Sequence, residues 1–147
     1  MARSGLERRL NRELEWGEHE YQYEACRIPY SLECHYVPDY ILANGILIEA
    51  KGHFTSADRR KMRAVKAAWP DIEIRFVFGR ATNRLNRTSK TTYAKWCDTK
   101  GFPWADKSIP DSWHMEKPFR QSIVALAELE SHFDPTRFFL RRVFGDS

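Results

Sequence analysis

The stretch "YVPDYILANGILIEAKGHF", residues 36–54, decides the fold because it predicts two β-strands joined by a tight turn. Asn44-Gly45 is a strong hairpin signal, and the flanking segments are rich in Ile, Leu and Tyr, which suit buried strands. These apolar strands nevertheless carry Asp39, Glu49 and Lys51 at central positions. Two acids and a lysine in a hairpin built for burial predict a chemical site.

The length of the turn decides whether the charged side chains of this hairpin meet. Residues two apart on a strand share a face, so Glu49 and Lys51 project together while Ala50 points away. A two-residue loop would pair Asp39 with Ala50 and turn the Asp39 carboxylate to the wrong face. A three-residue loop over residues 43–45, with its glycine in the left-handed region, pairs Asp39 with Glu49. The register of the hairpin is therefore a test of the site.

The three charged groups restrict the chemistry if they converge. Two carboxylates a few ångströms apart repel each other unless a cation lies between them, and hard oxygen ligands suit Mg²⁺ or Mn²⁺. A neighbouring lysine has a purpose when the substrate is a phosphate, because it can orient the nucleophile or stabilise the developing charge. On an arbitrary hairpin such residues are more often solvated surface, but the apolar neighbours Ile41, Leu47 and Ile48 weaken that interpretation. Metal-dependent phosphodiester hydrolysis is the predicted chemistry.

The rest of the chain predicts an α/β (α+β) fold with a small central mixed sheet flanked by helices. Four segments have helical spacing: residues 4–17, 56–70, 92–101 and 119–133. Ser4 and Ser56 are the expected N-caps of the first two. Two further segments, residues 21–28 and 72–79, have the alternating pattern of strands. Glu7 stands three residues after Ser4, as in a capping box, but it also borders the apolar stripe of the first helix. The sequence leaves both roles open for Glu7.

Composition predicts a single intracellular domain without a membrane span. The chain has 147 residues, a net charge of +4, no apolar run near 20 residues and no signal peptide, which is typical of a cytoplasmic protein. Its three cysteines, Cys26, Cys34 and Cys97, have no metal-binding or disulfide spacing and are expected to pack as small hydrophobes. The character changes at Pro118, so we predict one domain over 1–117 and a helical extension over 118–147 that packs on the domain or on a second subunit.

Several motifs in a fixed order carry a resemblance to a known family. They are "RSGLE", "YVPDYILANGILIEAKG", "IRFVFGRATNRL" and "TTYAKWCDTKGFPWADKSIP", and together they span roughly residues 3–117. The spacing D-x(n)-E-x-K alone is shared across the restriction-endonuclease-like superfamily, whereas the combination is far more specific. The chain resembles bacteriophage endonuclease I, the T-seven type of four-way (Holliday) DNA junction resolvase.

The resemblance implies a restriction-endonuclease-like fold, two Mg²⁺ or Mn²⁺ ions per active site, and an intertwined or domain-swapped homodimer that cuts opposed strands of branched DNA. It implies that Asp39 bridges both metals, that Glu49 binds one of them with the backbone carbonyl of Ala50, and that Glu7 completes the second. Lys51 is then the catalytic lysine. In that family the glutamate of the first helix comes from the other chain, across a bridging segment that is shorter here, residues 29–39. No small-molecule substrate and no membrane are implied, and a phage-encoded protein would act in the host cytoplasm.

Basic residues after the hairpin are candidates for contacts with DNA, because phosphate contacts supply most sequence-independent affinity. They lie in two groups, on the helix that follows the hairpin and in the acid-free run after the last predicted strand: Arg59, Arg60, Lys61, Arg63, Arg80, Arg84, Arg87 and Lys90. A solvated helix face and a mobile loop are the alternative interpretation. Two other functions stay open: a sequence-specific nicking, homing or restriction-type endonuclease on linear duplex, and a non-catalytic DNA-binding module. The intact reactive positions argue against the module.

Overall fold

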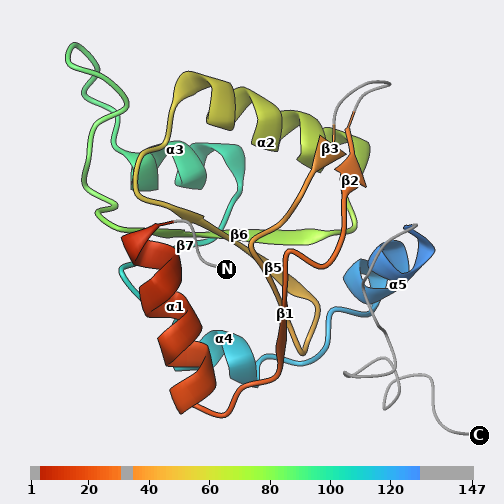
Figure 1. Cartoon of the computed structure of the whole chain (residues 1–147). Helices are drawn as coiled ribbons and strands as arrows, with labels where there is room; N and C mark the ends of the chain where they lie inside the picture. Colours follow the sequence, from red (N-terminus) through yellow and green to blue (C-terminus); the bar gives the residue numbers. More distant parts are fainter. Residues whose placement is uncertain (1–3, 31–34, 130–147) are drawn as a thin grey trace, which may run out of the picture.

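The computed structural model describes residues 4–30 and 35–129. A five-stranded mixed sheet forms its centre (Figure 1). The strands run in the order β1 (Tyr21–Tyr23), β4 (Tyr40–Leu42), β5 (Ile46–Lys51), β6 (Glu73–Phe78) and β7 (Trp104–Asp106). The first three are antiparallel and the last three parallel, so β5 is the strand at which the pairing changes. The predicted small mixed sheet is confirmed.

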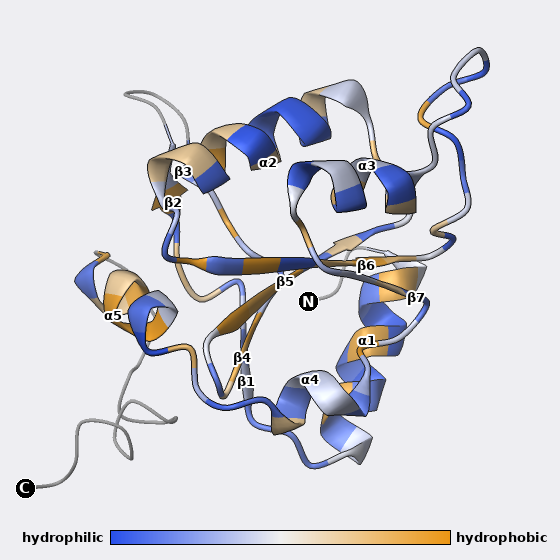
Figure 2. Cartoon of the chain, turned by 180° about the vertical axis from the view of Figure 1, so that it is seen from behind, coloured by the Kyte–Doolittle hydropathy of each residue, from blue (hydrophilic) through white to orange (hydrophobic). Residues whose placement is uncertain are grey.

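Helices cover both faces of the sheet (Figures 1 and 2). On one face lie α2 (Ser56–Ala68) and α3 (Tyr93–Lys100), and on the other α1 (Gly5–Trp16) and α4 (Asp111–Met115). A fifth helix, α5 (Arg120–Glu128), lies beside the turn between β4 and β5. Among the described residues, no helix is long and apolar enough to cross a bilayer.

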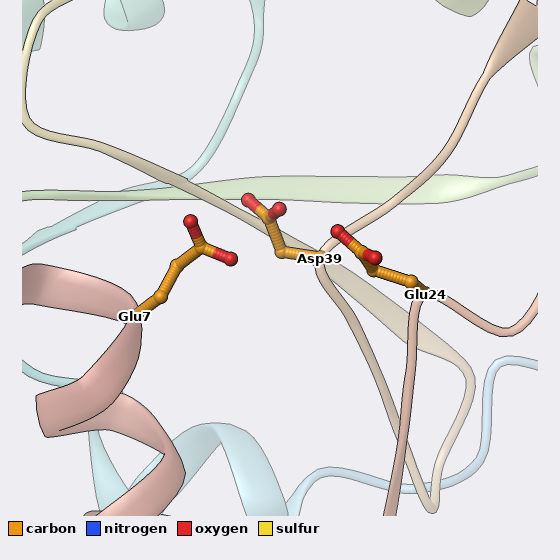
Figure 3. Close-up of side chains that lie close together, drawn as sticks. All are labelled: Glu7, Glu24 and Asp39. Atoms are coloured by element: carbon orange, nitrogen blue, oxygen red, sulfur yellow. The ribbon is translucent and has the colours of Figure 1, made fainter. Parts of the chain in front are cut away.

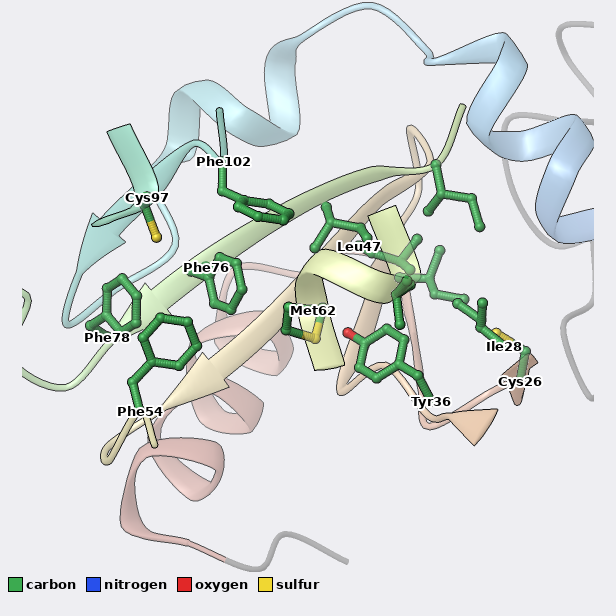
Figure 4. Close-up of a cluster of buried hydrophobic side chains, with 14 of the residues drawn as sticks. Cys26, Ile28, Tyr36, Leu47, Phe54, Met62, Phe76, Phe78, Cys97 and Phe102 are labelled. Atoms are coloured by element: carbon green, nitrogen blue, oxygen red, sulfur yellow. The ribbon is translucent and has the colours of Figure 1, made fainter. Parts of the chain in front are cut away.

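The face under α2 and α3 holds an aromatic core (Figure 4). Phe54 packs against Phe76, Phe78 and Trp96, with ring centroids 5.1 to 5.3 Å apart. Phe76 and Phe78 belong to the alternating face of β6 predicted from the sequence, and Ile72 and Ile74 lie in the same buried cluster. Phe54 lies three residues after the end of β5, so this core supports the strand that carries Glu49 and Lys51.

The segment predicted as one strand over residues 21–28 is two short strands. Glu24 has a positive φ of 45°, which non-glycine residues rarely adopt, and it breaks the strand after Tyr23. The chain before it pairs with β4, while β2 (Ile28–Pro29) pairs with β3 (His35–Tyr36) in a separate two-stranded sheet. Glu24 therefore belongs to neither strand and lies in the connection between β1 and β2.

Two helix boundaries and two short elements also differ from the prediction. The N-cap of α2 is Thr55 rather than Ser56: Thr55 Oγ1 accepts from the Asp58 N–H, and the Asp58 carboxylate accepts from the Thr55 N–H. The helix at the C-terminal end is described over Arg120–Glu128, and residues 130–147, with the predicted Phe133, lie outside the described part of the chain. Neither β7 nor α4 was predicted, because three and five residues are too few for a periodic pattern.

The hairpin turn has the three-residue form. Tyr40 pairs with Ile48 and Ile41 with Leu47, and Gly45 has φ +89° and donates its N–H to the Leu42 carbonyl at 2.9 Å. One further step along this register places Asp39 opposite Glu49. The predicted register is therefore confirmed.

The helix α5 packs on this turn and fixes it from outside. The Phe119 N–H donates to the Asn44 carbonyl at 2.8 Å, and the buried Ser122 hydroxyl donates to the Gly45 carbonyl at 2.7 Å. Ser122 Oγ also accepts from the Glu73 N–H at 3.1 Å, which ties the turn to the start of β6. The predicted boundary at residue 117 stays a prediction, but α5 shares the core of the sheet through Leu126.

Alanine at position 45 is expected to destabilise the protein more than alanine at position 101. Both glycines have positive φ, +89° and +81°, so each substitution carries backbone strain of about 1 kcal/mol. At Gly45 the new Cβ would also meet Ile123 Cγ1 at 2.6 Å, whereas nothing lies within 4 Å at Gly101. We expect Gly45→Ala to lower the free energy of unfolding by about 2 to 4 kcal/mol and Gly101→Ala by about 1 kcal/mol. Urea melts of both variants measure the difference, and equal losses of unfolding free energy would mean that Ile123 of α5 does not crowd residue 45.

Candidate functional site

Asp39 lies where β4 has ended and β5 continues. The last ladder pair is Tyr40 with Ile48, so the N–H of Ala50 has no strand partner on that side. Instead Ala50 donates to Asp39 Oδ2 at 2.8 Å. The carboxylate thus takes a place in the sheet that a backbone carbonyl would fill, and its position is fixed by the register of the hairpin.

Two more acids lie close to the Asp39 carboxylate, which stands between them in Figure 3. Glu7 in the first turn of α1 and Glu24 after β1 each offer an oxygen, and the ligand oxygens of the three acids lie within 4.8 Å of one another. Glu7 is only 8% exposed and accepts a 2.6 Å hydrogen bond from the Tyr23 hydroxyl, and its N–H is capped by Ser4. The Glu24 N–H donates to the Asp39 carbonyl at 3.1 Å. Glu7 thus lies in the first turn after the N-cap Ser4 and also faces the hairpin, and its role in the chemistry stays a prediction.

Glu24 was not among the residues predicted for the site. In the sequence it continues an alternating segment, and no motif or spacing separates it from a strand residue. Its place beside Asp39 depends on the positive φ that breaks the strand, and a glutamate in the sequence does not predict this backbone conformation. A non-glycine residue that leaves a strand in this conformation is frequently functional.

Glu49 and Lys51 form the other half of the site, on the face covered by α2. Lys51 Nζ lies 3.3 Å from Glu49 Oε2 and 3.3 Å from Asp58 Oδ1. The other oxygen of Glu49 accepts a 2.8 Å hydrogen bond from the Tyr36 hydroxyl. Glu49 is 4% exposed, so this acid is buried with two specific partners rather than solvated. Tyr36 and Asp58 were not predicted for the site.

Burial, more than repulsion between the acids, raises the pKa values of Asp39 and Glu49. Burial, then the charges of Glu49 and Glu7, raise the pKa of Asp39 to about 8, despite the Ala50 N–H and Lys51, which favour its ionised form. Burial also raises the pKa of Glu49, although Lys51 and the Tyr36 hydroxyl oppose the rise. Burial opposes the charged form of Lys51, but Glu49 and Asp58 overcome it and raise the lysine pKa. Burial therefore opposes the ionised forms of Asp39 and Glu49 more strongly than their hydrogen bonds and Lys51 favour them.

All four residues predicted from the sequence thus meet around the end of β5. Glu7 joins Asp39 directly, Lys51 pairs with Glu49, and the register sets Asp39 opposite Glu49. The individual metal-binding roles, including the carbonyl of Ala50, stay predictions. The third acid of the group that contains Asp39 and Glu7 is Glu24. Glu49 instead contacts Tyr36 through one carboxylate oxygen and Lys51 through the other.

The basic residues predicted for DNA contacts are not equally available. Arg59 donates to the Phe54 carbonyl at 2.8 Å and lies over the Phe54 ring, so it serves the fold locally. Lys61 is half-buried and close enough to favour the ionised form of Glu49. The others are exposed, on α2 or on the connection between β6 and α3, which projects from the body of the protein (Figure 1): Arg60, Arg63, Arg80, Arg84, Arg87 and Lys90. Their contacts with DNA stay predictions.

Comparison with known proteins places this geometry in context. A family model described as phage endonuclease I matches residues 1–132. The chain is 37% identical to "Endonuclease I" of Escherichia phage T7 over 117 residues, which cover 78% of each protein. It is 40% identical to "Endodeoxyribonuclease 1" of Enterobacteria phage T3 over 111 residues, 74% of this chain and 73% of the relative.

Proposed function

The chain belongs to the phage endonuclease I family and is a deoxyribonuclease, and from this we propose that it hydrolyses phosphodiester bonds in four-way junctions and other branched DNA with a divalent metal ion. The observation that carries the proposal is the meeting of Asp39, Glu49 and Lys51 at the end of β5, with Glu7 and Glu24 beside Asp39.

The described residues fit a hard divalent cation. One oxygen from each of three carboxylates lies within 4.8 Å of the others, and burial, with the charges of Glu49 and Glu7, raises the pKa of Asp39 to about 8. Oxygen ligands of this kind suit Mg²⁺ or Mn²⁺. Asp39, Glu7 and Glu24 would hold the ion, and Glu49 with the Ala50 carbonyl would hold the second ion that the family resemblance implies. When bound, the metal supplies a Lewis acid for the phosphate and lowers the pKa of water.

The chain's own groups orient and stabilise the reacting phosphate. Lys51 is 19% exposed in its side chain and lies at the end of a strand, so its ammonium is available to a phosphate oxygen while carboxylates hold it. Tyr36 fixes Glu49 through one oxygen, which leaves the other to Lys51. Ala50 fixes Asp39. Each reactive group is therefore held by a neighbour before DNA arrives, which is the preorganisation that electrostatic catalysis needs.

Resolution of a junction requires two cuts in opposed strands, so we propose that two copies of the chain act together as a homodimer. In the described structure Glu7 and Glu24 reach Asp39 of the same chain. Exchange of the segment that carries α1 and β1 between two chains would bring the same two acids from the partner. Part of the connection that such an exchange would use, residues 31–34, lies outside the described residues.

A comparison of junction and linear DNA tests the proposed function. The purified protein is incubated with a labelled immobile four-way junction or with a linear duplex of matched sequence, each with Mg²⁺ and with a chelator. We expect paired nicks near the branch point of the junction, little cleavage of the duplex and no cleavage with the chelator. Equal cleavage of the two substrates would contradict the preference for branched DNA and favour a sequence-specific endonuclease, and cleavage with the chelator would contradict the metal.

A further inference from the structure

Lys51 is held by acids from two different elements. Its ammonium lies 3.3 Å from Glu49 on the same strand and 3.3 Å from Asp58 in the first turn of α2. A lysine side chain has a flexible four-carbon stem, so one ion pair leaves its ammonium free to move around the partner. Two carboxylates on separate elements restrict it to the space between them.

Asp58 is itself fixed by the start of α2. Its Oδ2 accepts from the Thr55 N–H at 3.0 Å, and its own N–H donates to Thr55 Oγ1 at 3.1 Å. The remaining oxygen, Oδ1, faces Lys51. The two oxygens of Asp58 therefore serve two purposes, one for the helix cap and one for the lysine.

A purely structural account explains the first purpose but not the second. The capping box is complete without Lys51, and a partly exposed ion pair adds little to stability. Lys51 also has a counter-charge in Glu49, which is more deeply buried than Asp58. If Glu49 bound a cation, its interaction with Lys51 would weaken. Asp58 would then be the acid that keeps the Lys51 ammonium in place.

We infer that Asp58 is a positioning residue, which holds the Lys51 ammonium at the reacting phosphate while Glu49 is engaged elsewhere. The inference rests on the proposed function, because it assigns Lys51 to the cleavage of DNA. It adds that the N-terminus of α2 sets the position of the lysine, since the helix cap and the lysine contact share one side chain. Asp58 acts through Lys51 and is not expected to touch the substrate.

The variant Asp58→Asn separates the two purposes. An asparagine has one carbonyl oxygen and no charge, so it can complete the cap or accept from Lys51, but not both. We expect single-turnover cleavage to fall about 10- to 100-fold. Junction binding, measured with a chelator present, should stay within about twofold, because Asp58 positions Lys51 rather than DNA. Asp58→Glu restores the charge on a longer stem and should recover part of the rate.

Thr92→Ala is the matched control for the loss of a helix cap. Thr92 caps α3 with a 3.1 Å bond from the Lys95 N–H, and α3 does not contribute to the described site. Its melting temperature should fall while its cleavage rate stays that of the unmodified protein. Cleavage by Asp58→Asn at the unmodified rate, at a temperature where circular dichroism shows it folded, would overturn the inference.

A measurement of Lys51 itself distinguishes positioning from a general loss of structure. The ordered ammonium should give a ¹H–¹⁵N NMR signal at low temperature, assigned by its loss in Lys51→Arg. We expect the signal to vanish in Asp58→Asn and to persist in Thr92→Ala; persistence in Asp58→Asn would also overturn the inference. Failure of the proposed function would give a different result, namely equal cleavage of junction and duplex by the unmodified protein. The cleavage rates of the variants relative to the unmodified protein could then still be measured on either substrate.

Discussion

Replacement of Lys51 by alanine is expected to lower the rate of DNA cleavage by about 1,000-fold, the cost of removing one preorganised donor to a charged transition state. The ammonium lies 3.3 Å from a carboxylate oxygen of Glu49 and 3.3 Å from one of Asp58, so it is held in position before DNA binds. Junction binding should remain, since many phosphate contacts share the affinity and the loss of one changes it little. Single-turnover cleavage and a gel-shift assay with a chelator measure the two effects separately.

Lys100→Ala is the matched control for the loss of a positive charge. Lys100 lies exposed in the last turn of α3. Its replacement should change neither cleavage nor binding by more than about twofold, as expected of a single screened surface charge. A Lys51→Ala protein that retains a tenth of the cleavage rate, or that loses binding and cleavage in parallel, would contradict a catalytic role for Lys51.

Replacement of Asp39 by asparagine should abolish cleavage and change how the stability of the metal-free protein depends on pH. Cleavage is expected to fall by at least about 1,000-fold, because Asp39 is the acid shared by both halves of the site. Asparagine has the same shape and can still accept from the Ala50 N–H, so the hairpin should keep its register. Glu24→Gln removes a carboxylate from the edge of the same group and should weaken cleavage less, mainly through a higher Mg²⁺ requirement.

The pH effect follows from the raised pKa of Asp39. The folded protein keeps the proton up to about pH 8, whereas an unfolded chain releases it near 3.8. The associated stability is fully present below pH 4 and is lost as the pH rises through 8, on the order of a few kcal/mol. Thermal melts with a chelator should therefore show the unmodified protein losing stability from pH 5 to pH 8 and Asp39→Asn losing much less. Identical pH profiles would contradict the raised pKa of Asp39.

Much of the site could be predicted from the hairpin alone. The period of two along β5 puts Glu49 and Lys51 on one face, and the positive φ of Gly45 gives the loop length that sets Asp39 opposite Glu49. These are local rules with few alternatives once the turn is recognised. Spacing alone did not decide whether Glu7 serves the helix cap or the catalytic site. The resemblance to the endonuclease family then predicted Glu7 as a residue of the site.

The residues that escaped prediction depend on contacts between distant elements or on unusual backbone. Glu24 joins the acids because one residue adopts φ 45°, and Asp58 reaches Lys51 because a capping box fixes its carboxylate. Tyr36 belongs to a two-residue strand that no period could reveal. The packing of α5 on the turn likewise depends on Ser122, a single polar residue on an otherwise ordinary amphipathic helix.

The place of β5 in the sheet has a consequence for the order in which the enzyme is made. Every reactive side chain lies between Glu7 and Asp58, whereas the parallel partner of β5 comes only with Glu73–Phe78, and the helix that fastens the hairpin turn comes after residue 119. A protein leaves the ribosome N-terminus first, so the growing chain displays its acids and lysine long before it can assemble them. We expect fragments that end before β6 to carry all of these groups and to cut nothing, because β5 then lacks its parallel partner.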